Sequence, residues 1–281
     1  MLDIDLPELP PRVRSYLDAV VKSCTQSNLK LVSVLLFGSA AKGGFNREMS
    51  DVDLIAVLPK GATTEDQALL RAAIADLEVR YGFKEAVPER SSLRKLADRV
   101  GGNNLSCFVC TRDDLTSGKV NRVFGLSQVE TIFIDRIVLA NVIESAITVW
   151  GEDLLHLVQA PIVRRLDVFK AYFAFTNQIM LSLVAYAFLP DATRYAMGTL
   201  KRSLHSCYFC YQHTTIALEE EVEFFEQRLG KSDTIRQLLA LRAQYENSFR
   251  FVVRCVPLLL HLHFRTAIDN SFPPHPQTRG P

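Results

Sequence analysis

The sequence has almost no net charge, because 32 lysine and arginine residues are balanced by 31 aspartate and glutamate residues, which leaves +1 at neutral pH. Without a strong field of one sign, the chain has no global attraction for nucleic acid or anionic lipid. A long polymer substrate is therefore disfavoured, although a local basic groove could still bind one. Internal repeats and low-complexity blocks are also missing. The composition is that of an ordinary globular protein, long enough for two domains.

The amino-terminal segment lacks both a basic start and the apolar run of a secretory signal. Residues 1–17 read MLDIDLPELPPRVRSYL, with acids and prolines instead. We therefore expect a cytoplasmic protein. The uncharged segment 171–189 has about the length of a membrane span, but Asn177 and Gln178 lie at its centre. A helix buried between other helices is the better interpretation, and we expect no membrane partner.

Four of the six cysteines form two Cys-x-x-Cys pairs. Cys107 and Cys110 lie in an expected strand, where side chains three residues apart point to opposite faces and cannot hold one ion. Cys207 and Cys210 lie on an expected helix and share a face, so a structural metal there remains an alternative to buried thiols. Reduced thiols are the expectation for a cytosolic protein.

One stretch, residues 35–55, combines a turn with two acids: LLFGSAAKGGFNREMSDVDLI. An apolar run ends before Gly38 and Ser39, and Asp51 and Asp53 then alternate with apolar residues. In a strand, residues i and i+2 point to the same face, so the two carboxylates would project together. Like charges held side by side favour a hard divalent cation, most simply Mg²⁺, with substrate phosphates completing its shell.

The glycine and serine of this stretch predict a phosphate site. Gly38 lets the backbone turn tightly and approach a ligand, and a helix starting at Ser39 would direct free N–H groups at a phosphate. Lys42, in the following Lys-Gly-Gly loop, is a further candidate for a phosphate contact. The ordinary alternatives are a plain turn, a solvated lysine and a solvated strand edge.

The pattern of an apolar run, Gly-Ser, eleven residues and Asp-Val-Asp-Leu resembles the signature of the DNA polymerase β-like nucleotidyltransferase superfamily. Over about residues 30–225 the chain looks most like aminoglycoside adenylyltransferases of the streptomycin and spectinomycin kind. This resemblance implies transfer of a nucleoside monophosphate, AMP from ATP, to a hydroxyl of a small molecule. It also implies that Asp51 and Asp53 are catalytic and hold Mg²⁺. An aminoglycoside is the acceptor that the resemblance suggests.

A third carboxylate, which the family takes from a neighbouring strand, has no obvious counterpart. Alignment with the family places Ser106 at that position, and serine is a poor metal ligand and no base at neutral pH. Asp113, Asp114, Glu85 and Glu89 are the acids that could replace it. Two alternatives stay open: a nucleotidyltransferase acting on a protein or tRNA, as in toxin–antitoxin systems, and a catalytically inactive nucleotide-binding or interaction module.

The second half of the chain contains one candidate for nucleotide binding. The related enzymes send a basic residue from a similar Thr-Leu-x-Arg helix to the triphosphate, and Arg202 in GTLKRSLHS matches it. Its planar fork suits two phosphate oxygens, although a solvated Lys201–Arg202 pair is the alternative. His205 is expected in the core or a cleft. It follows Arg202 too closely for the Arg…His pair of helical ribonuclease domains, which leaves that function a weak third option.

Hydrophobic periodicity and turn residues predict the secondary structure. Helices are expected at 10–27, 40–42, 64–81, 91–100, 135–149, 166–189, 193–218, 219–229 and 234–251. Strands are expected at 29–37, 50–58, 105–111 and 127–134. Pro257 should interrupt the final apolar stretch. The expected fold is an α/β nucleotidyltransferase domain, a small mixed sheet flanked by helices, over 1–155, then an all-α domain over 156–268 and a disordered tail over 269–281.

Overall fold

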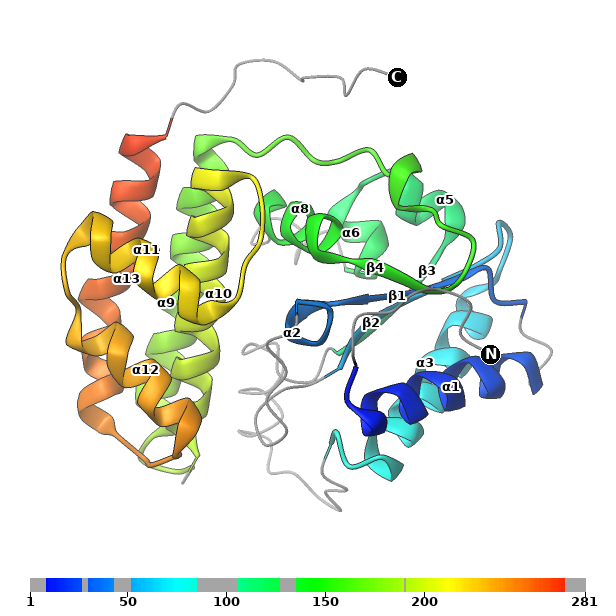
Figure 1. The fold of residues 1–281 in the computed structure, drawn as a ribbon, viewed down its shortest axis with the longest axis horizontal. Coiled ribbons are helices and arrows are strands. Elements are labelled where there is room, and N and C mark those ends of the chain that lie inside the picture. The colour runs from blue at the N-terminus through cyan, green and yellow to red at the C-terminus, as the bar shows by residue number, and fades with distance from the viewer. Residues whose placement is uncertain are drawn as a thin grey trace. The chain divides into compact units, whose positions relative to one another are not determined.

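The computed structural model describes residues 9–26, 30–42, 52–84, 106–126, 135–189 and 191–270 (Figure 1). These residues divide into two compact units. The first contains the described residues up to 84 together with 106–126 and 142–160, and the second contains 135–141 and 161–270. A small mixed sheet with flanking helices forms the first unit and helices form the second, which confirms the predicted fold class. The predicted elements at 91–100 and 127–134 and the tail 271–281 lie outside the described residues.

The sheet has four strands among the described residues, in the order β3-β2-β1-β4. Their bounds are Ser33–Phe37 for β1, Asp53–Leu58 for β2, Cys107–Thr111 for β3 and Ile147–Gly151 for β4. β1 pairs antiparallel with both β2 and β4, and β2 pairs parallel with β3. The carboxyl end of β1 and the amino ends of β2 and β3 therefore meet at one edge of the sheet.

Two helices, α1 (Pro11–Gln26) and α3 (Thr64–Arg80), pack on one face of this sheet (Figure 1). An apolar stripe with the helical period runs along α1 and is buried throughout. Tyr16 is buried beside this stripe and contacts the rings of Tyr81 and Phe83, at centroid distances of 5.8 Å and 5.1 Å. The stripe consists of Val13, Leu17, Val20, Val21 and Cys24.

Helix α3 begins at Thr64, as expected, but its N-cap is one residue earlier than the N-cap that the capping-box pattern predicts, Thr64 with Gln67. Thr63 is the N-cap: its Oγ1 accepts from the Asp66 N–H at 3.1 Å, and its own N–H donates to Asp66 Oδ2 at 2.8 Å. The expected cap at Thr64 with Gln67 as partner was wrong, since the carboxylate one residue earlier closes the capping box. Leu69 is 64% exposed and does not belong to the buried stripe, which contains Leu70, Ile74 and Leu77.

The helix expected at 135–149 was wrong at its carboxyl end. Helix α8 (Arg136–Ser145) stops, and the next residues form β4 against β1. The short apolar run at 147–151 fits a strand as well as a helix, so the available partner strand decides. Gly151 has a φ of 82° and ends β4, and a side chain there would overlap the Val32 carbonyl oxygen. The short elements of the first unit are α2 (Gly38–Ala41), α5 (Arg112–Thr116), α6 (Val120–Val123) and η1 (Leu155–Leu157).

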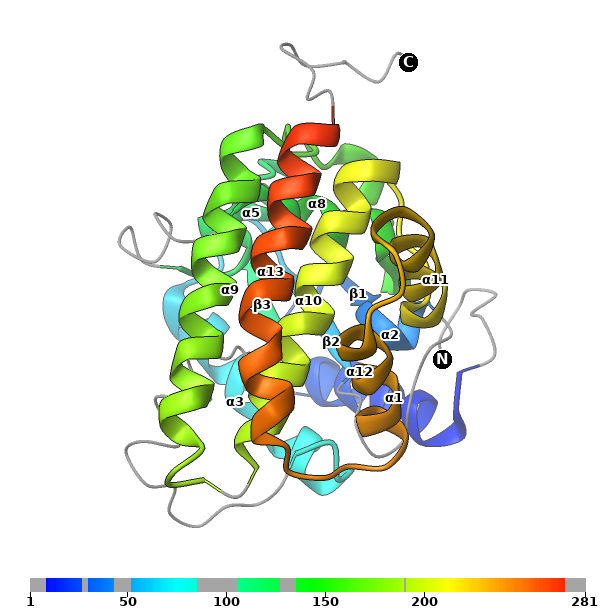
Figure 2. The ribbon, with the colours of Figure 1, turned by 90° about the vertical axis from the view of Figure 1, so that its left-hand side faces the viewer.

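The second unit is built around three long helices that lie side by side in Figure 2. They are α9 (Arg165–Ala185), α10 (Ala192–Gln212) and α13 (Phe249–Asp269), and α11 (Leu218–Leu229) and α12 (Asp233–Ala243) connect the last two. The helix expected at 234–251 is broken, because Ser248 caps α13 through its hydroxyl. Pro257 does not interrupt α13, whose packing against α9 and α10 outweighs the single lost backbone hydrogen bond.

A buried polar cluster joins α10 to α13. His263 Nε2 is 2.8 Å from Ser203 Oγ, and its Nδ1 is 3.7 Å from Cys207 Sγ. Burial lowers the pKa of His263 to about 3 and raises that of Cys207 to about 12. A neutral imidazole and a protonated thiol fit an inert core. Within the described part of the chain, no group of three or more potential ligands is arranged to hold a metal ion.

Asp135 is one of three buried acids among the described residues of the same unit, with Asp167 and Glu221. Its Oδ1 accepts from the Val138 N–H at 3.1 Å, so it caps α8. Burial raises the pKa of Asp135 to about 7, and the charge of Asp167 acts in the same direction. The group is therefore neutral in the folded protein at a pH where it ionises in the unfolded chain.

Asp135→Asn should add a positive slope to the pH dependence of stability. Between about pH 4 and 6.5 the unfolded chain binds a proton at His263 that the folded protein lacks, which raises stability with pH by about 1.4 kcal/mol per unit. The folded protein binds a proton at Asp135 that the unfolded chain lacks, which lowers stability with rising pH by the same amount per unit. Asparagine keeps the cap but cannot titrate. Urea unfolding at pH 4.5, 5.5 and 6.5 measures the difference, and parallel curves for both proteins would contradict it.

Candidate functional site

The two ends of the Gly-Ser…Asp-Val-Asp stretch meet at the edge where β1 ends and β2 and β3 begin. Phe37, the last residue of β1, is paired with Asp53, the first residue of β2. Gly38 follows with a φ of 71°, and a Cβ built on it would overlap Asp53 Oδ2 and lie 3.3 Å from Asp53 Cγ. The carboxylate therefore rests directly on the glycine backbone. Only glycine combines this backbone angle with this close approach.

The turn residues are accessible at this edge. Gly38 and Ser39 are half-buried and begin α2, which has only four residues and therefore little dipole of its own. Lys42 ends α2, where its N–H donates to the Gly38 carbonyl at 3.2 Å. The predicted helical turn after the glycine is confirmed. An exposed backbone with a nearby cation is a suitable surface for an anion.

Only one of the two predicted metal-binding carboxylates can be placed. Asp53 is half-buried at the start of β2, while the next residues of the strand point into the core. Asp51 lies outside the described residues. Carboxylate oxygens are the ligands that Mg²⁺ prefers, and Asp53 presents one beside a backbone that a phosphate could approach, so its position fits a Mg²⁺ ligand.

A carboxylate that was not predicted lies next to Ser106. The Ser106 hydroxyl donates to Glu78 Oε1, and Lys84 Nζ is 2.5 Å from Glu78 Oε2. Glu78 belongs to α3 and is only 2% exposed. Ser106 itself immediately precedes β3, and its carbonyl accepts from the Leu54 N–H. The position expected to carry the third carboxylate thus contacts a buried glutamate from a helix.

The carboxylates of Asp53 and Glu78 both act on the hydroxyl of Tyr16. Burial, and then the negative charges of Glu78 and Asp53, raise the pKa of the Tyr16 hydroxyl above its ordinary value. This hydroxyl is buried and has no hydrogen-bond partner among the described residues. Asp53 and Glu78 are therefore both near one orphaned polar group behind the sheet edge. The glutamate side chain gave no sequence signal, because a lone acid near a helix end usually faces solvent.

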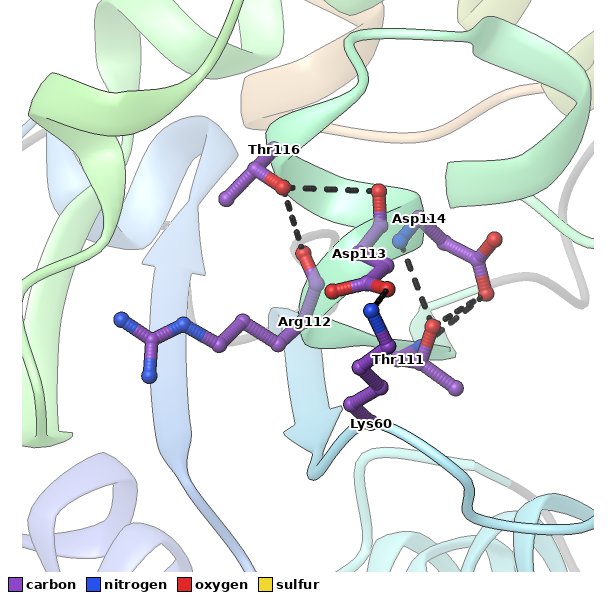
Figure 3. A network of polar contacts seen from close by, with 6 residues as sticks. All are labelled: Lys60, Thr111, Arg112, Asp113, Asp114 and Thr116. Carbon is purple, nitrogen blue, oxygen red and sulfur yellow. Dashed lines mark hydrogen bonds and ion pairs between the residues drawn. The ribbon is translucent and has the colours of Figure 1, made fainter.

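Asp113 and Asp114, the two acids after β3, lie at the end of the sheet opposite Asp53. Asp113 pairs with Lys60 at 3.0 Å, and Asp114 Oδ2 accepts from Thr111 Oγ1 at 2.6 Å, capping α5 (Figure 3). Because β3 is parallel to β2, its first residue lies near Asp53 and its last residue, Thr111, lies at the opposite end of the sheet. The five residues from Ser106 to Thr111 span about 16 Å. Both residues have structural roles there and are too far away to replace the third carboxylate. Glu85 and Glu89 lie outside the described residues.

Comparison with known proteins agrees with this geometry. Residues 17–101, which include the whole Gly-Ser…Asp-Val-Asp stretch, match the family model of the nucleotidyltransferase domain. The chain carries a nucleotidyltransferase domain. This confirms the resemblance drawn from the motif.

A solved structure with a similar fold is the spectinomycin adenyltransferase AAD(9) from Enterococcus faecialis, crystallised with ATP and spectinomycin. The two chains are 12% identical and superpose with a TM-score of 0.53, over 90% of this chain and 98% of that one. At this identity the likeness shows the fold alone. No curated protein matches the sequence significantly.

Arg202 belongs to the helical unit that accompanies the nucleotidyltransferase domain. Its Nη2 donates to Gln178 Oε1 of α9 at 2.8 Å, and the Thr199 hydroxyl donates to the same oxygen at 3.1 Å. The guanidinium is half-buried and held in one orientation by this shared acceptor. His205 Nδ1 is 2.6 Å from Glu221 Oε1. An Arg that is already oriented loses less side-chain entropy when it binds an anion.

Ser106→Ala should destabilise the nucleotidyltransferase domain by about 1.5–3 kcal/mol, because it removes a hydrogen bond to the buried carboxylate of Glu78. Guanidinium unfolding measures the loss. Ser117→Ala is the control, since the Ser117 hydroxyl donates to the neutral Asp114 carbonyl at 2.7 Å and accepts from the Lys119 N–H at 3.3 Å, and neither partner is a charged group. The control should lose about 0.5–1.5 kcal/mol. Equal losses in the two variants would mean that the Glu78 contact is not charge-assisted.

Proposed function

We propose that the protein transfers AMP from ATP to a hydroxyl of a small molecule, with pyrophosphate as the leaving group. The observation that carries this proposal is the packing of the Asp53 carboxylate on the Gly38 backbone, inside the region that matches the nucleotidyltransferase domain. A turn that can approach phosphates is therefore in direct contact with an acid that can hold a cation. This pairing suits a nucleoside triphosphate and little else.

Each residue of the edge has a defined task in this proposal. The backbone N–H groups of Gly38 and Ser39 bind the β and γ phosphates, and Lys42 adds a positive charge. Asp53, with Asp51, would hold Mg²⁺. When bound, this ion neutralises charge on the triphosphate. By holding the outer phosphates, Gly38 fixes the α-phosphorus relative to the acceptor, and Asp53 would contribute only through the cation that it would hold. Such positioning accounts for most of the rate in phosphoryl-type transfer.

A second candidate function is nucleotide binding without transfer. One observation favours it: Ser106 replaces an acid, and the nearby Glu78 is buried and already bound to Ser106 and Lys84. A carboxylate in two such contacts is poorly available to take a proton from an acceptor hydroxyl. General-base catalysis contributes roughly 10²–10⁴-fold, so its lack would leave binding intact and turnover slow.

One experiment distinguishes these functions and the acceptor classes. The protein is incubated with Mg²⁺, a pool of metabolites, total tRNA and a protein extract, and each labelled nucleoside triphosphate in turn. Mass spectrometry then follows the label. Labelled small molecules support the proposal, and labelled tRNA or protein supports an acceptor of the toxin–antitoxin kind. ATP binding by calorimetry without any labelled product supports the inactive module. Absence of both binding and label overturns all three.

We also propose that Arg202 contacts the outer phosphates, so Arg202→Lys should weaken ATP binding much more than AMP binding. A point charge would replace a planar two-pronged contact, which costs about tenfold or more in ATP affinity. Calorimetry with both nucleotides measures the difference. Arg236→Lys is the control, because Arg236 is exposed and pairs with Glu226 at 2.5 Å. Equal loss for ATP and AMP would contradict the contact.

A further inference from the structure

An unusual apolar stripe runs along the exposed side of α9 and the turn that follows it. Its large side chains are between 40% and 69% exposed: Leu166, Phe169, Phe173, Met180, Val184 and Phe188. With Asn177 included, the successive spacings are three, four, four, three, four and four residues. This average of about 3.7 residues is close to the helical period, so the stripe stays on one side of the helix along its whole length.

Helix α13 presents a second stripe of the same kind. The exposed residues are Phe249, Val253, Pro257, Leu260, Phe264 and Ile268, again three or four apart. All of α13 and of residues 165–189 is described, and no exposed charged residue lies within either stripe. Charged side chains such as Arg250 and Arg265 lie beside the second stripe. Together the two stripes expose eleven large apolar side chains and one proline on two neighbouring helices.

The two stripes form one continuous surface. Helices α9 and α13 pack against each other and run in opposite directions, as the ring contacts of Tyr172 with His263 at 6.1 Å and of Tyr186 with Phe249 at 5.1 Å require (Figure 2). This register places each exposed residue of α13 between two exposed residues of α9 along the common axis. We call this surface the α9–α13 face.

The size of the α9–α13 face approaches that of a stable protein interface. Each helix is about 30 Å long and the pair about 20 Å wide, which gives about 600 Å². The largest apolar patch of a typical monomer covers about 300–600 Å², and a standard interface buries about 800 Å² per partner. The rim side chains around the two stripes would supply the remaining area.

We propose that a second copy of this chain covers the α9–α13 face, so that α9 and α13 of two molecules form an antiparallel four-helix interface. The position of Asn177 favours a second copy of the chain over other partners. It lies midway between Leu166 and Phe188, at the centre of the apolar stripe. A two-fold axis crossing α9 there brings Asn177 against its copy, where two carboxamides can each donate and accept a hydrogen bond. A single asparagine in an apolar seam sets the register of such helices.

A membrane fits these observations less well. Both α9 and α13 are long and apolar enough to span a bilayer by length and composition, and 33% and 44% of their apolar windows are buried within the protein. A bilayer would leave Asn177 without a polar partner at the centre of the face, which is costly in hydrocarbon. Vesicle binding is therefore the competing outcome of the test.

Asn177→Cys provides a direct test, because all six native cysteines are buried and do not compete for oxidation. Under mild oxidation the variant should form a disulfide-linked dimer within minutes, seen on a non-reducing gel. Gln227→Cys, which adds an exposed thiol on α11 instead, is the matched control and should stay monomeric. Crosslinking of both variants at equal rates, or of neither, would overturn the proposal.

Light scattering and vesicle flotation complete the test with the native protein. The native chain should have twice the monomer mass, and Phe173→Glu should give the monomer mass with an unchanged circular dichroism spectrum. A native monomer that floats with phosphatidylserine vesicles would overturn the proposal in favour of a membrane surface. A native monomer that does not float would overturn it as well.

Discussion

Replacing Gly38 with alanine should lower the rate of nucleotidyl transfer by about 10²-fold, because it displaces the Asp53 carboxylate from the turn. The new Cβ would occupy the space of Asp53 Oδ2, at a backbone angle that alanine also disfavours. Either the carboxylate or the turn must move by a large fraction of an ångström. The measurement is kcat/KM with ATP and the acceptor found by mass spectrometry, together with ATP affinity by calorimetry in case turnover is slow.

Gly61→Ala is the matched control for this substitution. Gly61 has a φ of 91°, so alanine meets a similar backbone penalty, but no atom lies within 4 Å of its added Cβ. The control should lose about 1–2 kcal/mol of stability and no activity. If both variants lost activity equally, the effect would come from backbone strain and not from the Gly38–Asp53 contact.

Asp53→Asn should reduce transfer by about 10³-fold and remove the Mg²⁺ dependence of ATP binding, since an amide cannot replace the negative charge that holds the cation. The side chain keeps its shape, so the contact with Gly38 and the register of β2 against β1 should survive. Calorimetry of ATP with and without Mg²⁺ and a thermal melt measure the two consequences. Unchanged Mg²⁺-dependent ATP affinity would remove Asp53 from the metal site.

Asp113→Asn is the control acid. It lies beyond the carboxyl end of β3, an end about 16 Å from Ser106 along the strand, and there it is half-exposed and pairs with Lys60. A surface pair of this kind contributes little to stability, and its loss should leave transfer unchanged. Lost activity in Asp113→Asn would show that the site extends to this end of the sheet and would contradict the assignment of Asp113 to the α5 turn.

The core of the candidate site was predictable because it is local. Gly38, Ser39 and Asp53 lie within sixteen residues, and a strand, a turn and a second strand bring them back together whatever the remaining chain does. The continuous apolar run after Asp53 then keeps the rest of the second strand in the core and leaves Asp53 at its rim. Glu78 could not be predicted in this way. Its burial depends on the contact of α3 with the start of β3, two segments that are far apart in the sequence.

Errors in the predicted elements have the same origin. Residues 147–151 became β4 because β1 offered an unpaired edge, and a short apolar run does not choose between helix and strand. Pro257 stayed inside α13 because α9 and α10 hold both halves of that helix. Leu69 is exposed because a neighbour on a helix lies about 100° away from the buried side, which only the packed helix reveals.

The sequence by itself determined the nucleotidyltransferase motif, the periodicity of the long helices and the division into a mixed sheet and a helical part, since each follows from short-range spacing. Tertiary structure alone decided that Asp53 rests on Gly38, that Ser106 meets Glu78 and that Asp113 is remote. It also left the α9–α13 face exposed. These features depend on strand order and helix packing. Hydrophobic spacing predicts that a residue is buried, but it does not predict which residues it packs against.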